Sequence, residues 1–331
     1  CIRDRWKHVY HNGRFCGVFQ FTNQGARQFS LDAKPENIEE LAALTAIYRP
    51  GPLKANVHRK YVKAKKNADS IHYDHPIIKE ILGPTFGFVT FQEQFMLLAQ
   101  KLAGFDPGES DKLRKTLVKK SLDTMHSKGS EKAIAREKFI KGAKELNEVP
   151  EHISSKLWQE IENFAVYGFN KSHAAAYAII AYQTAFLKTY YPHEFFAASM
   201  SMELSNQKKL SEFYEELKRL GINIIRPDIN KCYADFSSDG KNFLYALGAI
   251  KSVGFEAISK IVEERNKNGV FKDLTDFINR ANPKYINKLQ LEGLVKAGAF
   301  DNLYKNRHSL YLSLIHISEP TRLRRISYAV F

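Results

Sequence analysis

Residues 164–188 read FAVYGFNKSHAAAYAIIAYQTAFLK and contain the most distinctive local pattern in this sequence. Gly168 predicts a turn, and the NKS sequence that follows predicts the start of a helix, with Ser172 as its capping residue. We expect that helix to cover residues 173–190. The first turn of a helix carries backbone N–H groups without intrahelical partners, so this start predicts an anion-binding site flanked by Lys171 and His173.

The same helix is expected to carry four residues on one face, at helical spacing: Tyr177, Ala181, Thr184 and Lys188. Such a face would hold a phosphate and a stacked base. The spacing alone slightly favours the alternative, an Ala-rich core helix in which Tyr177 packs inward and Lys188 is solvated.

The rest of the chain is predicted to be mainly helical. Apolar residues recur at helical spacing in seven further segments: residues 37–48, 91–102, 110–120, 151–164, 205–220, 256–265 and 287–296. Short strands are predicted at 222–230 and 242–247, because the residue pattern changes near Gly221 from helical spacing to short apolar runs separated by turn residues. We therefore expect a mainly α protein with a small mixed segment, and a domain boundary between about 221 and 240.

Length and composition limit the class of protein. The 331 residues exceed what one hydrophobic core usually organises, so two or more domains are expected. A hydrophobic content of 44% indicates a folded chain. No run of about 18 apolar residues and no signal-peptide pattern occurs, which favours a cytoplasmic protein without a membrane span. The three cysteines lack a C-x-x-C spacing, so neither a disulfide framework nor a zinc site is indicated.

The charge balance predicts a polyanionic partner. The net charge is +14, and clustered cations gain affinity by releasing counterions from phosphate backbones. Nucleic acid is therefore the first expectation and a membrane surface the second. Five cations are phosphate candidates, four of them spaced to share part of one helix surface: Arg49, Arg114, Lys115, Lys119 and Lys120. The alternative is a solvated basic face on an ordinary enzyme.

A second nucleic-acid signal lies in residues 246–265, ALGAIKSVGFEAISKIVEER. The apolar turn at 252–254 leads directly into a helix, a pattern typical of a helix-hairpin-helix. That motif binds duplex nucleic acid through backbone N–H groups and phosphate oxygens. A weaker second copy is predicted at 291–301, LEGLVKAGAFD. The alternative is two ordinary helix turns with small residues.

Motifs for metal-dependent or nucleophilic chemistry are absent from the sequence. It contains no D-x-D pair, no H-E-x-x-H, no P-loop and no G-x-S-x-G. Two-metal phosphoryl transfer needs closely placed carboxylates, so we predict no metal site in this chain.

The two ends of the sequence indicate a partial reading frame. The chain opens on Cys1 instead of Met. Residues 312–322 (LSLIHISEPTR) and 326–331 (ISYAVF) match the translation of a transposon-type sequencing adapter on either side of its index. We therefore expect residues 312–331 to be an adapter artefact, and not a natural basic tail.

Seven motifs occur in one order: IYRPGPL (47–53), FGFVTFQEQFM (86–96), LRKTLVKKS (113–121), YGFNKSHAAAYAIIAYQTAFLK (167–188), RPDIN (226–230), LGAIKSVG (247–254) and LVKAGAFD (294–301). Together they resemble the alpha subunits of bacterial DNA polymerase III, the C-family replicative polymerases, over nearly all of residues 10–311. The resemblance implies a helical fingers domain over 1–235, whose first part would reach the palm junction. It also implies a tandem helix-hairpin-helix DNA-binding region over 236–311.

In function, the resemblance implies a fragment of a DNA-directed DNA polymerase that acts in chromosomal or phage replication. Its substrates would be deoxynucleoside triphosphates and primer-template DNA, and Mg²⁺ would be held by aspartates of a palm domain outside this chain. The full-length enzyme would bind a sliding clamp and other replisome subunits, in the cytoplasm and away from membranes. The fragment alone is expected to be inactive. The alternative is a non-catalytic helix-hairpin-helix DNA-binding module.

The matched motifs also imply site residues. Nucleotide binding is expected from Arg49, Arg114, Lys119, Lys120, Asn170, Lys171, Ser172 and His173. DNA binding is expected from Lys115, Lys188, Lys251, Gly254 and Lys296. Tyr177 and Tyr182 are each expected either beneath the base pair or in the core.

Two residues depart from the family pattern. Val118 stands where many relatives have Gly, which would change the turn before Lys119. Ser252 replaces the first hairpin Gly, and we expect a weaker first DNA-binding copy because a positive φ is harder for Ser to adopt.

Overall fold

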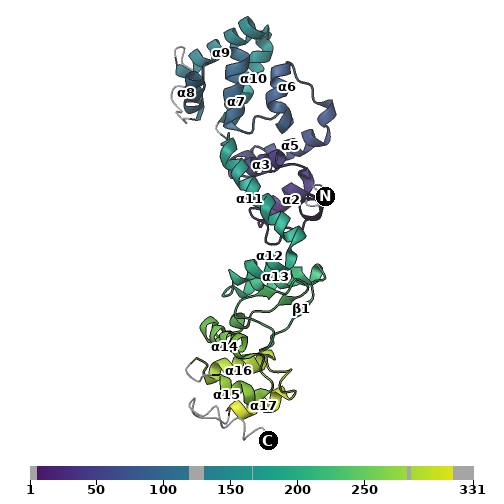
Figure 1. Cartoon of the computed structure of the whole chain (residues 1–331). Helices are drawn as coiled ribbons and strands as arrows, with labels where there is room; N and C mark the ends of the chain where they lie inside the picture. The colour runs from purple at the N-terminus through teal and green to yellow at the C-terminus, as the bar shows by residue number, and fades with distance from the viewer. Residues whose placement is uncertain (1–5, 119–129, 166, 282–284, 316–331) are drawn as a thin grey trace. The chain divides into compact units, whose positions relative to one another are not determined.

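A computed structural model describes residues 6–118, 130–165, 167–281 and 285–315. The chain divides into two compact units, Cys1–Phe186 and Leu187–Phe331, so the expected domain boundary at residue 235 lies inside the second unit (Figure 1). The fold is mainly helical, as predicted, with one small sheet in the described part. None of the helices described is both long and apolar enough to span a membrane.

The first unit consists of helices and helical turns. They are η1 (Trp6–His11), α2 (Gln24–Ala33), α3 (Ile38–Ile47), α4 (Pro50–Lys54), α5 (Val57–Lys66), η2 (Ala68–Ser70), α6 (Pro76–Leu82), η3 (Gly83–Thr85), α7 (Gln92–Ala103), α8 (Pro107–Val118), α9 (Glu131–Asn147), α10 (Glu151–Ala165) and most of α11 (Lys171–Tyr190).

In its described residues, the second unit adds six helices, a helical turn and three short strands. They are α12 (Pro192–Ser201), α13 (Gln207–Arg219), β1 (Ile224–Ile225), β2 (Ser237–Ser238), β3 (Phe243–Leu244), η4 (Leu247–Ala249), α14 (Phe255–Asn268), α15 (Leu274–Arg280), α16 (Lys288–Ala297) and α17 (Arg307–Ile315). The last four residues of α17 belong to the expected adapter segment 312–331, of which residues 316–331 lie outside the described residues.

Short polar side chains fix the helix starts. Asn37 accepts a hydrogen bond from the Glu40 N–H at 2.8 Å and begins α3, and Ser130 accepts from the Ala133 N–H at 3.2 Å and begins α9. The predicted helices are confirmed to within a few residues. Of the described helices that the predicted segments do not include, α9 is the longest; its fully buried stripe contains only Phe139 and Ala143, and its other positions are mostly charged.

Two cores organise the first unit. One lies among α6, α7, α8, α9 and α10, which gather in Figure 1, and its largest members include Phe95, Phe139 and Trp158. The other joins η1, α2, α3 and α5 to α11. From α11 it takes four fully buried alanines at positions i, i+4, i+7 and i+11: Ala174, Ala178, Ala181 and Ala185. The Ala-rich face therefore lies in the core.

The second unit contains a three-stranded sheet in the order β1-β3-β2. Strands β1 and β3 are parallel, β2 and β3 are antiparallel, and each is shorter than the predicted strands. The loop between β1 and β2 is tied to the helices beyond it. The buried Arg265 donates from Nη1 to the carbonyls of Ile229 and Cys232, at 2.8 and 2.7 Å. Asn230 pairs through its side-chain amide with the backbone of Phe271. The RPDIN motif therefore has a structural role, because its loop is hydrogen-bonded to α14 and to the segment that follows it.

A glycine sets the closest approach of α9 to α7. A Cβ atom on Gly142 would lie 2.1 Å from the backbone oxygen of Ala103. Since a backbone atom cannot rotate away, we expect Gly142→Ala to lower the free energy of unfolding by about 1–3 kcal/mol, as overpacked core substitutions do.

The matched control is Gly108→Ala in α8, where the nearest atom to the new Cβ is a side-chain oxygen of Asp106 at 3.2 Å. Alanine is the better helix former, so this variant should be neutral or up to about 1 kcal/mol more stable. Urea unfolding followed by circular dichroism measures both. Equal stabilities for the two variants would contradict the assigned packing of α7 on α9.

Candidate functional site

The turn before α11 is joined to the start of α7. Phe91 and Phe169 form an isolated parallel bridge. The Gln92 N–H donates to the Phe169 carbonyl at 2.9 Å, and the Phe169 N–H donates to the Thr90 carbonyl at 3.3 Å. The Gln92 side chain adds a bond to the Gly168 carbonyl at 3.2 Å. Residues that are far apart in the sequence are thereby held side by side.

The carboxylate of Glu93 holds the first turn of α11. It accepts hydrogen bonds from Asn170 Nδ2 at 3.0 Å and from the Lys171 N–H at 2.9 Å. Asn170 Oδ1 in turn accepts from the His173 N–H at 2.8 Å, so Asn170, and not Ser172, caps the helix. The N–H groups of Lys171 and His173 already have partners, so the predicted anion site cannot rely on these two backbone donors.

Arg49 is brought to the same turn. Its Nε donates to the Ala46 carbonyl at 2.8 Å, its Nη2 donates to the Tyr167 carbonyl, and its Cζ lies 4.2 Å from the centroid of the Phe169 ring. Burial lowers the pKa of Arg49 from its ordinary value. A Cβ on Gly51 would lie 2.4 Å from the Tyr167 ring, so the RPGP turn packs closely against this segment.

The side chain of Lys171 is available at the surface. It is about half exposed, and its Nζ lies 3.8 Å from Glu39 Oε1 and 5.9 Å from the centroid of the Phe91 ring. An exposed pair at that distance contributes little free energy, so the ammonium can exchange Glu39 for another anion at small cost.

Rings continue from this turn along α11. The ring centroids of Phe169 and His173 are 5.2 Å apart, those of His173 and Tyr177 4.4 Å, and those of Tyr177 and Phe19 5.4 Å. Tyr182, by contrast, lies 5.3 Å from Trp6 and packs against the core. The two tyrosines, which the sequence left equivalent, therefore differ: Tyr177 belongs to the partly exposed row of rings, and Tyr182 to the core.

Two of the cations predicted on residues 110–120 are placed on α8. Arg114 and Lys115 both contact Asp111, at 2.9 and 2.7 Å. Hydrogen bonds from Lys115 and then Arg114 hold the pKa of the Asp111 carboxyl below its ordinary value. Lys119 and Lys120, like the turn expected to follow Val118, lie outside the described residues.

The position of Lys188 differs from the one expected of a DNA contact. Its side chain is buried, and Nζ donates to Glu216 Oε1 at 2.8 Å, with Arg219 on the other oxygen of that carboxylate at 2.8 Å. Burial raises the pKa of Glu216, but the bonds from Lys188 and Arg219 outweigh it and hold that pKa below its ordinary value. Contact with DNA would require Lys188 to lie at the surface, but its ammonium is buried in an ion pair with Glu216.

The first predicted hairpin is present at residues 251–254. Ser252 adopts a φ of 68° and Gly254 a φ of 80°, so serine takes the left-handed conformation here, at a cost of roughly 1–2 kcal/mol. A Cβ on Gly293 of α16 would lie 3.0 Å from the Lys251 carbonyl oxygen, which explains the close packing of α16 on the hairpin. Lys251 and Ser252 are exposed.

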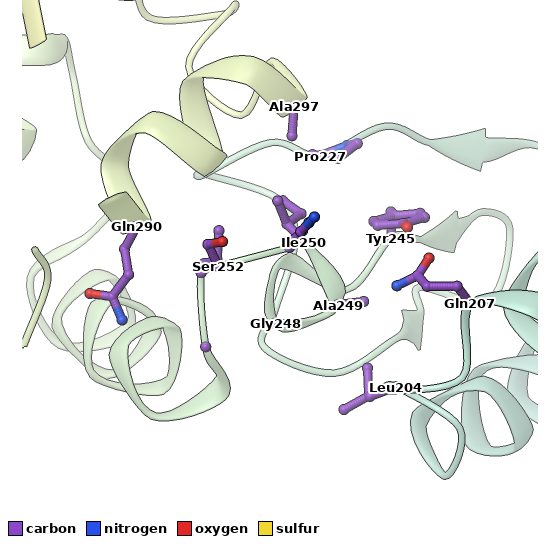
Figure 2. Close-up of a pocket in the computed structure, with 13 residues that line it drawn as sticks. Leu204, Gln207, Pro227, Tyr245, Gly248, Ala249, Ile250, Ser252, Gln290 and Ala297 are labelled. Atoms are coloured by element: carbon purple, nitrogen blue, oxygen red, sulfur yellow. The ribbon is translucent and has the colours of Figure 1, made fainter. Parts of the chain in front are cut away.

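The hairpin borders an open hollow of about 990 Å³ (Figure 2). Gln290 at the start of α16, Tyr245 after β3 and Gln207 at the start of α13 line the same hollow. The polar groups around it are amides, hydroxyls and the Lys251 ammonium, and no carboxylate of the part of the chain that the structure describes lines it.

Lys296 lies at the end of α16. Its Nζ is 4.7 Å from the centroid of the Tyr311 ring and 3.9 Å from Glu292 Oε2. A hydrogen bond with Tyr311 raises the pKa of Lys296 above its ordinary value.

Three residues of these sites have no predicted role: Glu93, Phe169 and Gln290. Glu93 belongs to the quoted motif FGFVTFQEQFM and lies in a first helical turn, where acidic residues are common. Its partner is 77 residues away in the sequence, so local pattern could not reveal its role.

The side chains of the described residues do not form a binding site for a magnesium ion. Within the described ranges, no three His, Cys, Asp or Glu side chains are grouped so that they could hold a metal. We therefore derive no step through a metal from these residues.

Comparison with known proteins gives two family matches. Residues 5–147 match the model of the bacterial DNA polymerase III alpha subunit finger domain, and residues 221–310 match that of a helix-hairpin-helix motif. The turn at 169–173 lies between the two matched segments.

The curated relatives are proteins named DNA polymerase III subunit alpha. The chain is 43% identical to that of Borreliella burgdorferi over 307 residues, which cover 93% of this chain and 26% of the relative. It is 44% identical over 302 residues to that of Caulobacter vibrioides, covering 91% and 26%, and 42% identical over 303 residues to that of Aquifex aeolicus, covering 91% and 25%. The chain thus spans about a quarter of the length of these relatives.

The ion pair of Lys188 gives a test of the geometry in the second unit. Lys188→Ala leaves Glu216 buried with Arg219 alone, and we expect a loss of about 3 kcal/mol of stability. Lys188→Met combined with Glu216→Leu should recover most of that loss, because both charges are then removed. Chemical denaturation measures each value.

The pH dependence of the same variants follows from the lowered pKa of Glu216. The pair stabilises the fold above the ordinary carboxyl pKa, about 4.3, and this stabilisation is lost as the pH falls through the lower folded-state pKa. The penalty of Lys188→Ala should therefore shrink on acidification below about pH 4. A penalty that stays constant down to pH 2 would show that Glu216 is not the partner.

Proposed function

The chain belongs to the DNA polymerase III alpha-subunit family, and on this basis we propose that it forms the part of a DNA-directed DNA polymerase that binds the incoming nucleotide and the primer-template. One observation carries the proposal. Arg49 and His173, predicted from two separate motifs, both lie against the ring of Phe169, and Asn170 and Lys171 follow that ring in the same turn.

We assign the triphosphate to the cations at this turn. Two of the five N–H groups of Arg49 are used by the carbonyls of Ala46 and Tyr167, which fix the guanidinium and leave further donors for phosphate oxygens. Lys171 adds a mobile ammonium whose present partner, Glu39, is weakly held. Cations aimed at a departing pyrophosphate stabilise the charge that grows on it.

We assign the base to the row of rings. The faces of His173 and Tyr177 are partly exposed beside Lys171, and base–aromatic stacking tolerates any base. The capping bond of Asn170 and the Glu93 carboxylate orient these rings by fixing the first turn of α11. Ser172, exposed in that turn, would add a hydroxyl donor.

Arg114, Lys119 and Lys120 are proposed as further contacts of the nucleotide phosphates, and Lys115 as a contact of the primer-template. For Arg114 and Lys115 this requires exchange of Asp111 for a phosphate, which costs little because these ion pairs are exposed.

We propose that the second unit holds the duplex. Lys251 and Gly254 would meet the phosphate backbone at the hairpin, and Lys296 would do so at the second copy. The fingers domain would cover 1–235 and the tandem helix-hairpin-helix region 236–311. Residues 312–331 would be foreign to both.

In the whole polymerase, the carboxylates that bind Mg²⁺ are proposed to come from outside this chain. The sliding clamp and other replisome subunits are its proposed partners, and the bacterial cytoplasm is its proposed location.

The nucleotide site is tested by single substitutions. We expect Lys171→Ala to weaken binding of a deoxynucleoside triphosphate to the complex with primer-template by about tenfold or more, since a charge-assisted contact is worth about 1.5–3 kcal/mol. We expect His173→Ala to weaken it by about fivefold or more, since stacking of a base on an aromatic ring is worth about 1–3 kcal/mol. The matched control is Lys141→Ala, whose ammonium is also exposed and 3.8 Å from a carboxylate, that of Glu145. Titration with a fluorescent nucleotide measures all three, and equal affinities would refute the assignment.

Duplex binding and activity are tested together. The purified chain should bind primer-template weakly, with an affinity that falls steeply with salt, because phosphate contacts release counterions. Supplied with Mg²⁺ and all four deoxynucleotides, it should not extend the primer. Primer extension by the fragment would contradict the proposal that the carboxylates binding Mg²⁺ come from outside this chain. Absence of DNA binding would contradict the proposed function itself.

A further inference from the structure

Helix α5 presents an exposed row of cations that the proposed function has not used. Its sequence, VHRKYVKAKK, contains no acidic residue. Val57 and Tyr61 are buried and anchor one side of the helix, and the exposed side carries Arg59, Lys63 and Lys66 at positions i, i+4 and i+7. Lys60 is exposed beside them.

The row is not neutralised by neighbouring carboxylates. Among the residues that the structure describes, none of these four cations lies within 4.0 Å of an acidic side chain, whereas the next lysine around the helix, Lys65, pairs with Glu40 at 2.5 Å. Two other acids of the elements packed on α5 are also engaged: Gln28 donates to Asp32 of α2, and Lys171 lies near Glu39 of α3.

Helix stability does not explain the row. Cations in a last helical turn interact favourably with the helix dipole, which accounts for Lys63 and Lys66. Arg59 and Lys60 lie in the first turns, where the dipole disfavours positive charge. Like charges at i and i+3 or i+4, here Lys63 with each of the other three, repel one another and weaken a helix. The arrangement costs stability, as binding surfaces do.

We propose that the exposed face of α5, formed by Arg59, Lys60, Lys63 and Lys66, binds the phosphate backbone of DNA. The distance from Arg59 to Lys66 along the helix is about 10 Å at 1.5 Å per residue. One DNA strand carries a phosphate about every 3.4 Å along the duplex axis, so a helix lying along that axis would span about three such intervals, or four consecutive phosphates. The face has no exposed ring for stacking, so its contacts are electrostatic and independent of sequence.

The position of α5 in the chain connects this face to the nucleotide site. Helix α4 follows Arg49 directly, and α5 begins after Asn56. Both belong to the first unit, and α5 packs on the core that also holds the Ala face of α11. A strand bound to α5 would therefore be held by the same body as the nucleotide. This inference rests on the proposed binding of DNA by the chain.

The test compares two triple variants of the whole chain. Arg59→Gln/Lys63→Gln/Lys66→Gln removes three charges from α5. Arg136→Gln/Lys141→Gln/Lys144→Gln removes three exposed charges from α9, where Glu137 and Glu145 are interspersed. Fluorescence anisotropy with a labelled primer-template, repeated over a salt series, measures affinity and the slope of log K against log salt for each.

The α5 variant should bind about tenfold or more weakly at low salt, with a slope shallower by about 2 to 3, because each lost phosphate contact removes about one unit. The α9 variant should retain the slope of the unaltered chain. Arg59→Lys/Lys63→Arg/Lys66→Arg keeps the charges and should keep the slope too, and circular dichroism confirms that each variant is folded.

The outcomes separate this inference from the proposed function. If the unaltered chain binds DNA and the two glutamine variants have equal slopes, the α5 surface is refuted and the proposed function stands. If the unaltered chain binds no DNA, both are refuted. A loss of slope that the charge-keeping variant also shows would refute the electrostatic contact.

Discussion

The arrangement around α11 depends on the hydrogen bonds that the Glu93 carboxylate accepts. It receives one N–H from the side chain of Asn170 and one from the backbone of Lys171, and the Phe91–Phe169 bridge lies next to it. A carboxylate at a helix start is favoured by the helix dipole, and here one carboxylate serves the first turns of two helices, α7 and α11. This fixes the rings of Phe169 and His173 and gives Arg49 the surface on which it packs.

Helix α11 combines packing and binding on different faces. The four alanines that face the core permit close approach of η1 and of the segment around Val18, and they leave Lys171, His173 and Tyr177 on the other side. The two interpretations of this helix, core element and binding element, are therefore compatible. The same helix continues to Lys188, which is buried in an ion pair, so its two ends are held by different interactions.

Local pattern predicted half of the described α-helices, among them all but one of those with twelve or more residues, and the motifs that meet at the site, because capping residues and apolar spacing act within a few residues. It failed where partners are remote. Glu93 is paired with a residue 77 positions away, and Lys188 with one 28 positions away. The spacing placed Lys188 on the face of Tyr177, but Lys188 is buried because that part of α11 lies against Glu216 of α13. Ser252 shows the converse: serine is disfavoured at positive φ, yet the packing of Gly293 against the hairpin keeps that conformation.

The central claim is that the turn at 169–173, with Arg49, holds the nucleotide. Photo-crosslinking of an azido-substituted deoxyadenosine triphosphate to the chain, in the presence of primer-template, tests it most directly. Peptide mapping should locate the label within residues 167–177 or next to Arg49, and unmodified deoxynucleotide should compete it away. Competable label on the hairpin at 251–254, with none on the turn, would contradict the account.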